Sequence, residues 1–157
     1  MILRKTAYFA VLLFVFVFAS CQSNQVDTKL DPSIAAKQVI NEHVQMLNAH
    51  DLKGLVAQYD SKARITSSDW DGVIFGPQGA DQLYYQVFYV SPDAKYLVDN
   101  MVVTDSTIVI EYDAVGLKEK FNSTIRFDQR YCSIFKIKNN KIASEATYAN
   151  PRLYHAK

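Results

Sequence analysis

The chain has 157 residues, with 17 lysines and arginines against 16 aspartates and glutamates, so its formal net charge is +1. This length suits a single domain with short appendages. The near balance of charge gives no electrostatic basis for binding nucleic acid, and we do not expect that partner. The three histidines have no metal-ligand spacing, and CxxC, phosphate-loop and GxGxxG motifs are absent from the sequence, so we expect no metal and no cofactor.

The first twenty residues have the composition of a secretion signal. A positive pair precedes an apolar run over residues 7–19, which is shorter than the roughly twenty residues that a membrane-spanning helix needs. Residues 18–21 (FASC) resemble the bacterial lipobox, in which the cysteine is lipid-modified and becomes the new N-terminus. We therefore expect a lipoprotein signal peptide over residues 1–20 and a lipid anchor on Cys21. An ordinary cleaved signal and a retained anchor are the alternatives.

A lipid on Cys21 would tether the protein to a membrane of the bacterial cell envelope, outside the cytoplasm. Residues 21–31 are mainly polar and lack periodicity, which predicts a lipid-anchored tether. With Cys21 modified, Cys132 has no partner for an intrachain disulfide. We interpret Cys132 as a small packing residue.

Three helices are predicted in the first half of the domain. Asp31 is a helix cap, and apolar residues at helical spacing follow it over residues 32–49. A second, shorter helix is expected from its cap at Asp51 through Tyr59. The third covers residues 79–90 and ends at a Ser-Pro pair.

Strands dominate the remainder of the chain. The strongest pattern covers residues 126–137, where six alternate residues predict one inner face, namely Phe127, Gln129, Tyr131, Ser133, Phe135 and Ile137. Further strands are expected at residues 63–69, 95–103, 107–115 and 142–148, and a short one at 73–75. Helices followed by antiparallel strands predict an α+β domain over residues 32–150, with a C-terminal tail at 151–157.

Two short motifs carry a family resemblance. Residues 48–59, beginning NAHDL, resemble the junction between the first two helices of the nuclear transport factor 2-like superfamily. Residues 139–142 (NNKI) together with Tyr148 resemble the closing hairpin of its SnoaL-like domains. The resemblance covers residues 32–150. It implies a cone-shaped, strongly curved antiparallel sheet packed against three N-terminal helices, with a pocket at the open end and dimers formed through the outer sheet face.

The same resemblance gives no support to ketosteroid isomerase activity. It places the oxyanion-hole tyrosine of that branch at Val44, its general base at Ser67 and its protonated acid at Ser133. Val44 has no hydrogen-bond donor, and neither serine is a suitable proton carrier near neutral pH. In addition, Asn150 stands where SnoaL-like sequences often have an aspartate.

Tyrosine is unusually frequent, and nine of the ten tyrosines remain when Tyr8 is removed with the signal peptide. Tyrosine offers an apolar ring with a polar rim, which suits a small, largely apolar or aromatic ligand. The expected pocket lining is Tyr59, Ser67, Asp69, Trp70, Tyr84, Phe88, Gln129, Tyr131, Ser133 and Tyr148. Our leading hypothesis is a membrane-tethered domain that binds such a ligand outside the cytoplasm.

Two alternatives stay open. The first is an enzyme of the cyclase, isomerase or dehydratase kind in which Asp69 moves a proton, with Trp70 excluding water and raising the carboxyl pKa. Residues 69–72 (DWDG) equally fit a simple polar turn. The second alternative is a dimeric subunit that docks through an outer sheet face including Cys132 and Ile134. His43, on the flank of the first helix, is interpreted as a packing or surface residue.

Overall fold

The computed structural model describes residues 31–156, and its side chains over residues 31–150. The expected signal peptide, the lipidation site Cys21 and nearly all of the tether lie outside the described residues. Within the described part, no helix combines the length and the apolar character needed to cross a membrane.

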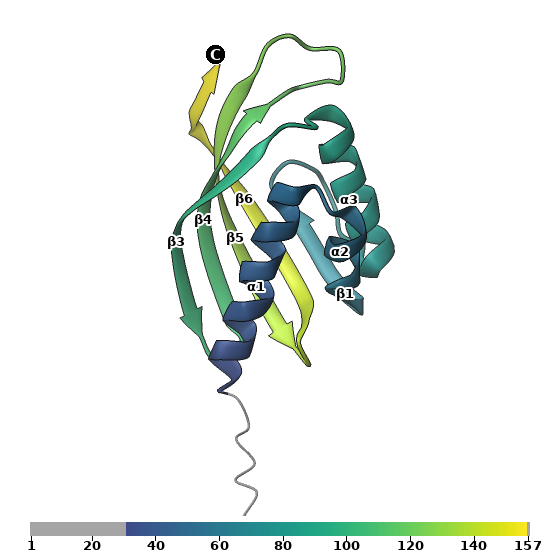
Figure 1. The fold of residues 1–157 in the computed structure, drawn as a ribbon, viewed down its shortest axis with the longest axis vertical. Coiled ribbons are helices and arrows are strands. Elements are labelled where there is room, and N and C mark those ends of the chain that lie inside the picture. The colour runs from purple at the N-terminus through teal and green to yellow at the C-terminus, as the bar shows by residue number, and fades with distance from the viewer. Residues whose placement is uncertain (1–30, 157) are drawn as a thin grey trace, which may run out of the picture.

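Three helices lie on one side of a six-stranded curved sheet (Figure 1). In chain order the elements are α1 (Pro32–Ala49), α2 (Leu52–Ala57), β1 (Tyr59–Ser67), β2 (Ile74–Phe75), α3 (Gly76–Val90), β3 (Lys95–Thr104), β4 (Thr107–Leu117), β5 (Phe127–Lys138) and β6 (Lys141–Ala156). The strand order across the sheet is β2-β1-β6-β5-β4-β3. Helix α1 packs against β3 and β4, and α3 packs against α2 and β1. The predicted α+β class with a curved sheet and three N-terminal helices is confirmed.

Helix α1 begins and ends where the sequence predicts. The Asp31 side chain accepts a hydrogen bond from the backbone amide of Ser33 at 2.9 Å, and the first helical residue is a proline, which needs no partner for an amide there. At the other end, His50 adopts the left-handed conformation with φ 54°. The Asp51 side chain then caps α2 by accepting from the amide of Gly54. Two capped helices therefore meet at a sharp corner.

Two predicted helix boundaries were wrong. Helix α2 ends at Ala57, and Tyr59 opens β1 instead, because Tyr59 pairs with Ile142 of β6 across the sheet. Helix α3 begins at Gly76, three residues before the predicted start, since the proline that follows is compatible with a first turn. Gly76 has φ 62°, and a Cβ there would lie 2.6 Å from the carbonyl oxygen of Ser61, so this start requires glycine.

The sheet is antiparallel except for one pair, since β1 runs parallel to β6. The alternation predicted for β5 is confirmed, because Gln129, Ser133, Phe135 and Ile137 are buried. The β5–β6 turn is also as expected, with both asparagines at positive φ. Strand β6 is longer than the predicted 142–148, and its last part, residues 151–156, falls in the range expected to be a tail.

A β-bulge in β6 changes which residues face inward. Ile137 of β5 pairs with Ile142, but its neighbour Lys136 pairs with Ser144, so Ala143 is an extra residue without a partner across the ladder. An extra residue reverses the alternation beyond it, since side chains repeat with a period of two. Glu145 therefore faces inward beside Phe135, to which it is paired.

Candidate functional site

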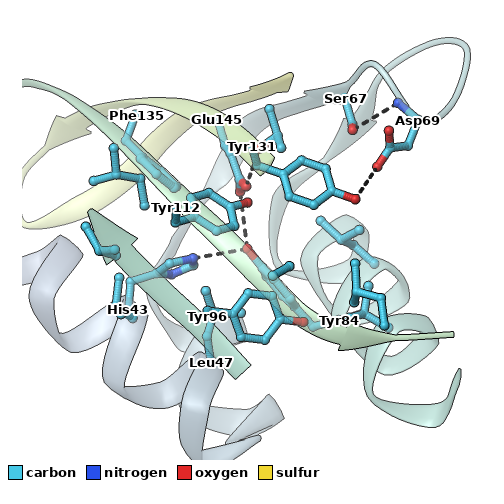
Figure 2. Close-up of a pocket in the computed structure, with 18 of the residues that line it drawn as sticks. His43, Leu47, Ser67, Asp69, Tyr84, Tyr96, Tyr112, Tyr131, Phe135 and Glu145 are labelled. Carbon is cyan, nitrogen blue, oxygen red and sulfur yellow. Dashed lines mark hydrogen bonds between the residues drawn. The ribbon is translucent and has the colours of Figure 1, made fainter. Parts of the chain in front are cut away.

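A cavity lies between the inner face of the sheet and helices α1 and α3. Its volume is about 110 Å³, well above the roughly 10–15 Å³ that one water molecule needs. The wall is mostly aliphatic and aromatic, with side chains from α1, α3 and strands β1, β3, β4, β5 and β6 (Figure 2). Mostly apolar walls with a few converging polar groups are typical of small-molecule sites.

Three tyrosines line the cavity from three adjacent strands. They are Tyr96 of β3, Tyr112 of β4 and Tyr131 of β5. Tyr112 pairs directly with Tyr131, and their rings stack with centroids 5.5 Å apart. The ring centroids of Tyr96 and Tyr112 lie 6.3 Å apart. The sheet side of the cavity is thus a continuous row of aromatic rings.

A buried carboxyl group, that of Glu145, lies on the same wall with only 6% of its surface exposed. Its Oε2 atom is hydrogen-bonded to the Tyr59 hydroxyl and lies 3.3 Å from the Tyr84 hydroxyl. Its Oε1 atom accepts a hydrogen bond from the Thr147 hydroxyl at 3.1 Å. The hydroxyl oxygens of Tyr59 and Tyr84 are 2.7 Å apart. Every polar atom of this acid therefore has a partner.

His43 extends this arrangement into helix α1. Its Nε2 atom lies 3.1 Å from the Tyr84 hydroxyl, and its Nδ1 atom lies 2.9 Å from Oε1 of Gln58. Gln58 in turn donates its amide to the carbonyl of Val39 at 3.1 Å, which fixes the orientation of its side chain. We call Glu145, Tyr59, Tyr84, His43 and Gln58 the buried network.

Counting protons assigns the charge of the buried network. Apart from the longer 3.3 Å contact between Tyr84 and Glu145, four hydrogen bonds join its five side chains in a row, and each of these four bonds needs one proton. The two phenols supply two, and a neutral His43 supplies a third through the Nδ1–H that faces Gln58. The fourth proton lies either on Glu145 or on Nε2 of His43. Burial favours the neutral forms of both groups, so we assign it to Glu145, in the bond to Tyr59.

The electrostatics agree with this assignment. Burial raises the pKa of the Glu145 carboxyl, against the opposing effect of its hydrogen bonds with Tyr59, Thr147 and Tyr84. Burial lowers the pKa of His43 to about 4, with the Gln58 hydrogen bond acting in the other direction. Burial also raises the pKa of both Tyr59 and Tyr84 well above the usual value, so the phenols keep their protons.

The rim of the cavity, formed by Asp69, Trp70 and Tyr131, has a different character. Asp69 is exposed, and its Oδ2 atom accepts a hydrogen bond from the Tyr131 hydroxyl at 3.2 Å. The expectation that Trp70 shields Asp69 from water is wrong, because Asp69 sits on the turn after β1 while the indole nitrogen of Trp70 is buried. This exposure removes the reason for treating Asp69 as a general base.

Two polar atoms on the cavity wall lack a partner among the described residues. They are the hydroxyl of Tyr96 and the Nε1 atom of Trp70, and both are buried. Tyr96 as a whole is only 8% exposed. A buried donor without a partner costs about 1–3 kcal/mol, so it is normally satisfied by water or a ligand.

Half of the predicted lining lies on the cavity wall. Ser67, Asp69, Trp70, Tyr84 and Tyr131 do so. Four others are displaced behind the wall: Tyr59 lies in the buried network, Phe88 stacks on His50 and Tyr84, Gln129 donates to the carbonyls of Arg130 and Asn150, and Ser133 bonds to Tyr112 and Thr147.

Tyr148 is a clear correction. It is 53% exposed and pairs with Cys132 on the outer face, because the bulge at Ala143 reverses the alternation of β6. The same bulge brings in Glu145, which the sequence analysis missed together with Tyr96 and Tyr112. One signal for Glu145 was available, since it is the single charged residue in 142–149 (IASEATYA).

His43 is a buried polar residue rather than a surface one.

No group of three or more metal-ligating side chains is found among residues 31–150. Cys132 is an unpaired thiol, and partial burial raises its pKa. The cavity and its rim are therefore the candidate site among the described residues.

Comparison with known proteins agrees with this architecture. The sequence profile of the SnoaL-like domain matches residues 40–145. No curated protein gives a significant match. Several solved structures share the fold.

One is the epoxide hydrolase/cyclase-like enzyme SalBIII, which has a role in pyran ring formation in the polyether salinomycin. It superimposes on this chain with a TM-score of 0.71 at 12% sequence identity, and the match covers 82% of this chain and 100% of SalBIII. A protein with a ketosteroid isomerase-like fold from Catenulispora acidiphila, in complex with trimethylamine, has a TM-score of 0.65 at 8% sequence identity. The match covers 74% of this chain and 88% of the other. A nuclear transport factor 2-like protein from Cytophaga hutchinsonii has a TM-score of 0.59 at 14% identity, covering 74% and 91%.

Proposed function

This chain belongs to the SnoaL-like domain family, and from that premise we propose that it binds a small, largely apolar ligand in the cavity beneath its curved sheet. The observation that carries the proposal is the buried Tyr96 hydroxyl, which has no partner among the described residues and lies on an otherwise mainly apolar wall. A ligand with one hydrogen-bonding atom would satisfy this hydroxyl while its apolar part fills the cavity.

The size and composition of the cavity support a ligand of about one ring. Residues Leu47, Val87 and Leu117 provide aliphatic contacts, and the three tyrosines of the sheet provide flat ones. At such a site the apolar contacts supply affinity, and the few polar atoms fix orientation. Among the fold relatives, one structure holds trimethylamine, which is consistent with small-molecule binding in this fold.

We test the binding proposal with Trp70, which is the one tryptophan of the sequence and lies on the cavity wall. Cyclohexanol, an apolar ring with one hydroxyl, is titrated while Trp70 fluorescence is recorded. We expect a saturable change in emission. Tyr96→Phe removes only the unpartnered hydroxyl and should weaken binding by about fivefold, or roughly 1 kcal/mol.

A blocking variant provides the control for that titration. Ala114 is buried and faces the cavity, so Ala114→Leu should fill the space and abolish the signal. Thermal unfolding of the variant checks that it is folded. An unsaturable signal in the unmodified protein, or an unchanged one in a folded Ala114→Leu variant, would contradict binding in this cavity.

The location of the protein is part of the proposal. Because Cys21 follows an apolar run and two small residues, we expect several acyl chains on it and stable attachment to a membrane of the cell envelope. Mass spectrometry of the mature protein should find lipid on Cys21 and nothing upstream of it, with Cys132 as an unlipidated internal control. An unmodified Cys21 would overturn the anchoring claim.

Self-association through the outer sheet face stays a prediction. Leu97, Val102 and Tyr148 are large apolar residues that are about half exposed or more. Each is paired across the sheet with a residue of the outer face. Sedimentation velocity should show a dimer that Tyr148→Glu weakens, and a monomer at all concentrations would contradict it.

A further inference from the structure

We propose that the ligand of this cavity carries a small alkylated ammonium group, seated against the tyrosine row and close to Glu145. This inference rests on the proposed binding function and names the chemical class of the ligand. Three features of the wall point to it: the sign of its ionisable groups, the aromatic side chains, and the surroundings of its buried acid, which has no basic partner.

The charge of the wall excludes an anionic ligand. The acid side chains that line the cavity are Asp69 and Glu145, and no lysine or arginine lines it among the described residues. His43, the remaining basic side chain on the wall, is committed to Tyr84 and Gln58 and is held neutral by burial. A carboxylate or phosphate would therefore be buried without a counter-charge, at high cost. A cation would meet no lysine or arginine among the described residues of this wall, and both of its acids ionise to the opposite charge.

The aromatic row favours the same sign of charge. Tyr96, Tyr112 and Tyr131 line the cavity from neighbouring strands, with adjacent ring centroids 6.3 and 5.5 Å apart. The faces of aromatic rings are electronegative, and a cation against them gains about 0.5–2 kcal/mol, more when it is removed from water. Alkyl groups on the nitrogen also contact aliphatic residues, so an alkylated ammonium matches this wall better than a bare one.

Glu145 supplies the third feature. It is a buried acid with hydroxyl partners only, since its contacts are Tyr59, Tyr84 and Thr147. Without a ligand it keeps its proton. When a cation binds nearby, the Glu145 O–H bond breaks, its electron pair stays on the carboxylate, and the proton passes to solvent. The hydroxyls of Tyr59 and Thr147 then donate to the carboxylate, so binding is coupled to the release of one proton.

The test uses two probes that differ in a single atom. Choline has a quaternary nitrogen where 3,3-dimethyl-1-butanol has a carbon, so the pair has nearly the same shape and differs in charge. We expect choline to bind about tenfold more tightly, from Trp70 fluorescence and calorimetry. Calorimetry at neutral pH in phosphate and in Tris should also show the release of protons, as a difference in apparent enthalpy.

Matched variants test the contributions of the acid and of the aromatic ring separately. Glu145→Gln keeps the shape of the side chain, and it should remove both the preference for choline and the proton release. Tyr112→Leu should weaken choline more than the neutral alcohol, because it removes a ring face but keeps the wall apolar. Tyr148→Leu is the control, because it removes an outer-face tyrosine away from the cavity and should change neither affinity.

The outcomes distinguish this inference from the binding function. Equal or tighter binding of the neutral alcohol would overturn the ammonium proposal and leave the cavity as an apolar binding site. Binding of cyclohexanol but of neither probe would have the same meaning. If none of the three compounds binds, the proposed function fails as well.

Discussion

Two carboxyl groups line one cavity, and their surroundings are opposite. Glu145 is 6% exposed and is hydrogen-bonded inside the buried network, whereas Asp69 lies on the exposed rim, where its carboxylate accepts from the Tyr131 hydroxyl and its backbone amide donates to the Ser67 hydroxyl. The same functional group is thus a neutral acid at one end and part of a solvated turn at the other. Burial raises the pKa of the Glu145 carboxyl and so favours its protonated form.

The two ends of the cavity also differ in how firmly their side chains are held and in how open they are to a ligand. The buried network ties together α1, α3, β1 and β6 through side-chain hydrogen bonds, so its members are fixed before any ligand arrives. The rim contributes fewer such bonds. On this side the cavity shares four lining residues with a neighbouring surface hollow, namely Asp69, Trp70, Leu83 and Val87. We infer that ligands enter along this rim and that the network holds the far wall in place.

Truncating each acid should give the largest contrast in stability. Glu145→Ala removes a buried side chain, which deprives Tyr59 of the carboxyl that donates to it and Thr147 of an acceptor, so we expect a loss of roughly 3–5 kcal/mol. Asp69→Ala removes an exposed group and should change stability by less than about 0.5 kcal/mol. Urea unfolding followed by Trp70 fluorescence measures both. Similar losses for the two variants would contradict the contrast.

The second prediction concerns acid and depends on His43. Its pKa is about 4 in the folded protein, below the roughly 6.5 of an unfolded histidine. As the pH falls from about 6.5 to 4, the unfolded chain takes up a proton that the folded one excludes, so stability should decrease by up to about 3 kcal/mol. The dependence should be measured by urea unfolding across this pH range.

Two variants isolate His43 as the cause. His43→Gln has no proton to gain and should flatten the acid limb, although it lowers stability at neutral pH. His50→Asn is the matched control, since asparagine tolerates the left-handed backbone at that position, and it should keep the slope. An unchanged slope in a folded His43→Gln variant would show that another group is responsible.

The fold was predictable because its signals are local. Caps at Asp31 and Asp51, the unbroken alternation of β5 and the two asparagines of the turn each act over a few residues, and all were found in place. The extent of α2 was not predictable in the same way. Tyr59 fits a helical stripe, but pairing with β6 outweighs that weak preference, and no local pattern reports a parallel partner more than eighty residues away.

The site was less predictable than the fold, and one residue explains most of the difference. Simple alternation places Ser144, Ala146 and Tyr148 on the inner face of β6. The extra residue at Ala143 exchanges the two faces, so Glu145 enters the cavity and Tyr148 leaves it. A bulge shifts a whole strand by one position, and its cause lies in the partner strand as much as in the local sequence. An error of one residue in register therefore assigns the wrong side chains of a strand to the site.

Glu145→Gln should change stability by less than Glu145→Ala does, and it tests the protonation state of the buried acid. Glutamine can donate from its amide to Tyr59 and accept from Thr147, as the protonated acid does, so stability at pH 5 should fall by less than about 1 kcal/mol. Because burial raises the Glu145 pKa above its unfolded value, the stability that its proton provides is lost as pH rises through the folded pKa. The variant should therefore gain on the unmodified protein between pH 5 and 8. A constant difference over this range would mean that Glu145 is ionised throughout.

The smallest effect is expected at the rim. Tyr131→Phe removes the hydroxyl that donates to Asp69 across 3.2 Å but keeps the ring stacked on Tyr112. The bond is made to an exposed carboxylate, where a water molecule can take the place of the lost hydroxyl. The free energy of unfolding should therefore change by about 0.5 kcal/mol or less. Tyr59→Phe makes the same atomic change inside the buried network and should cost about 1–3 kcal/mol, because Glu145 and Tyr84 lose a partner that water cannot replace. Equal losses for these two hydroxyls, measured by urea unfolding, would mean that solvent reaches both ends of the cavity alike.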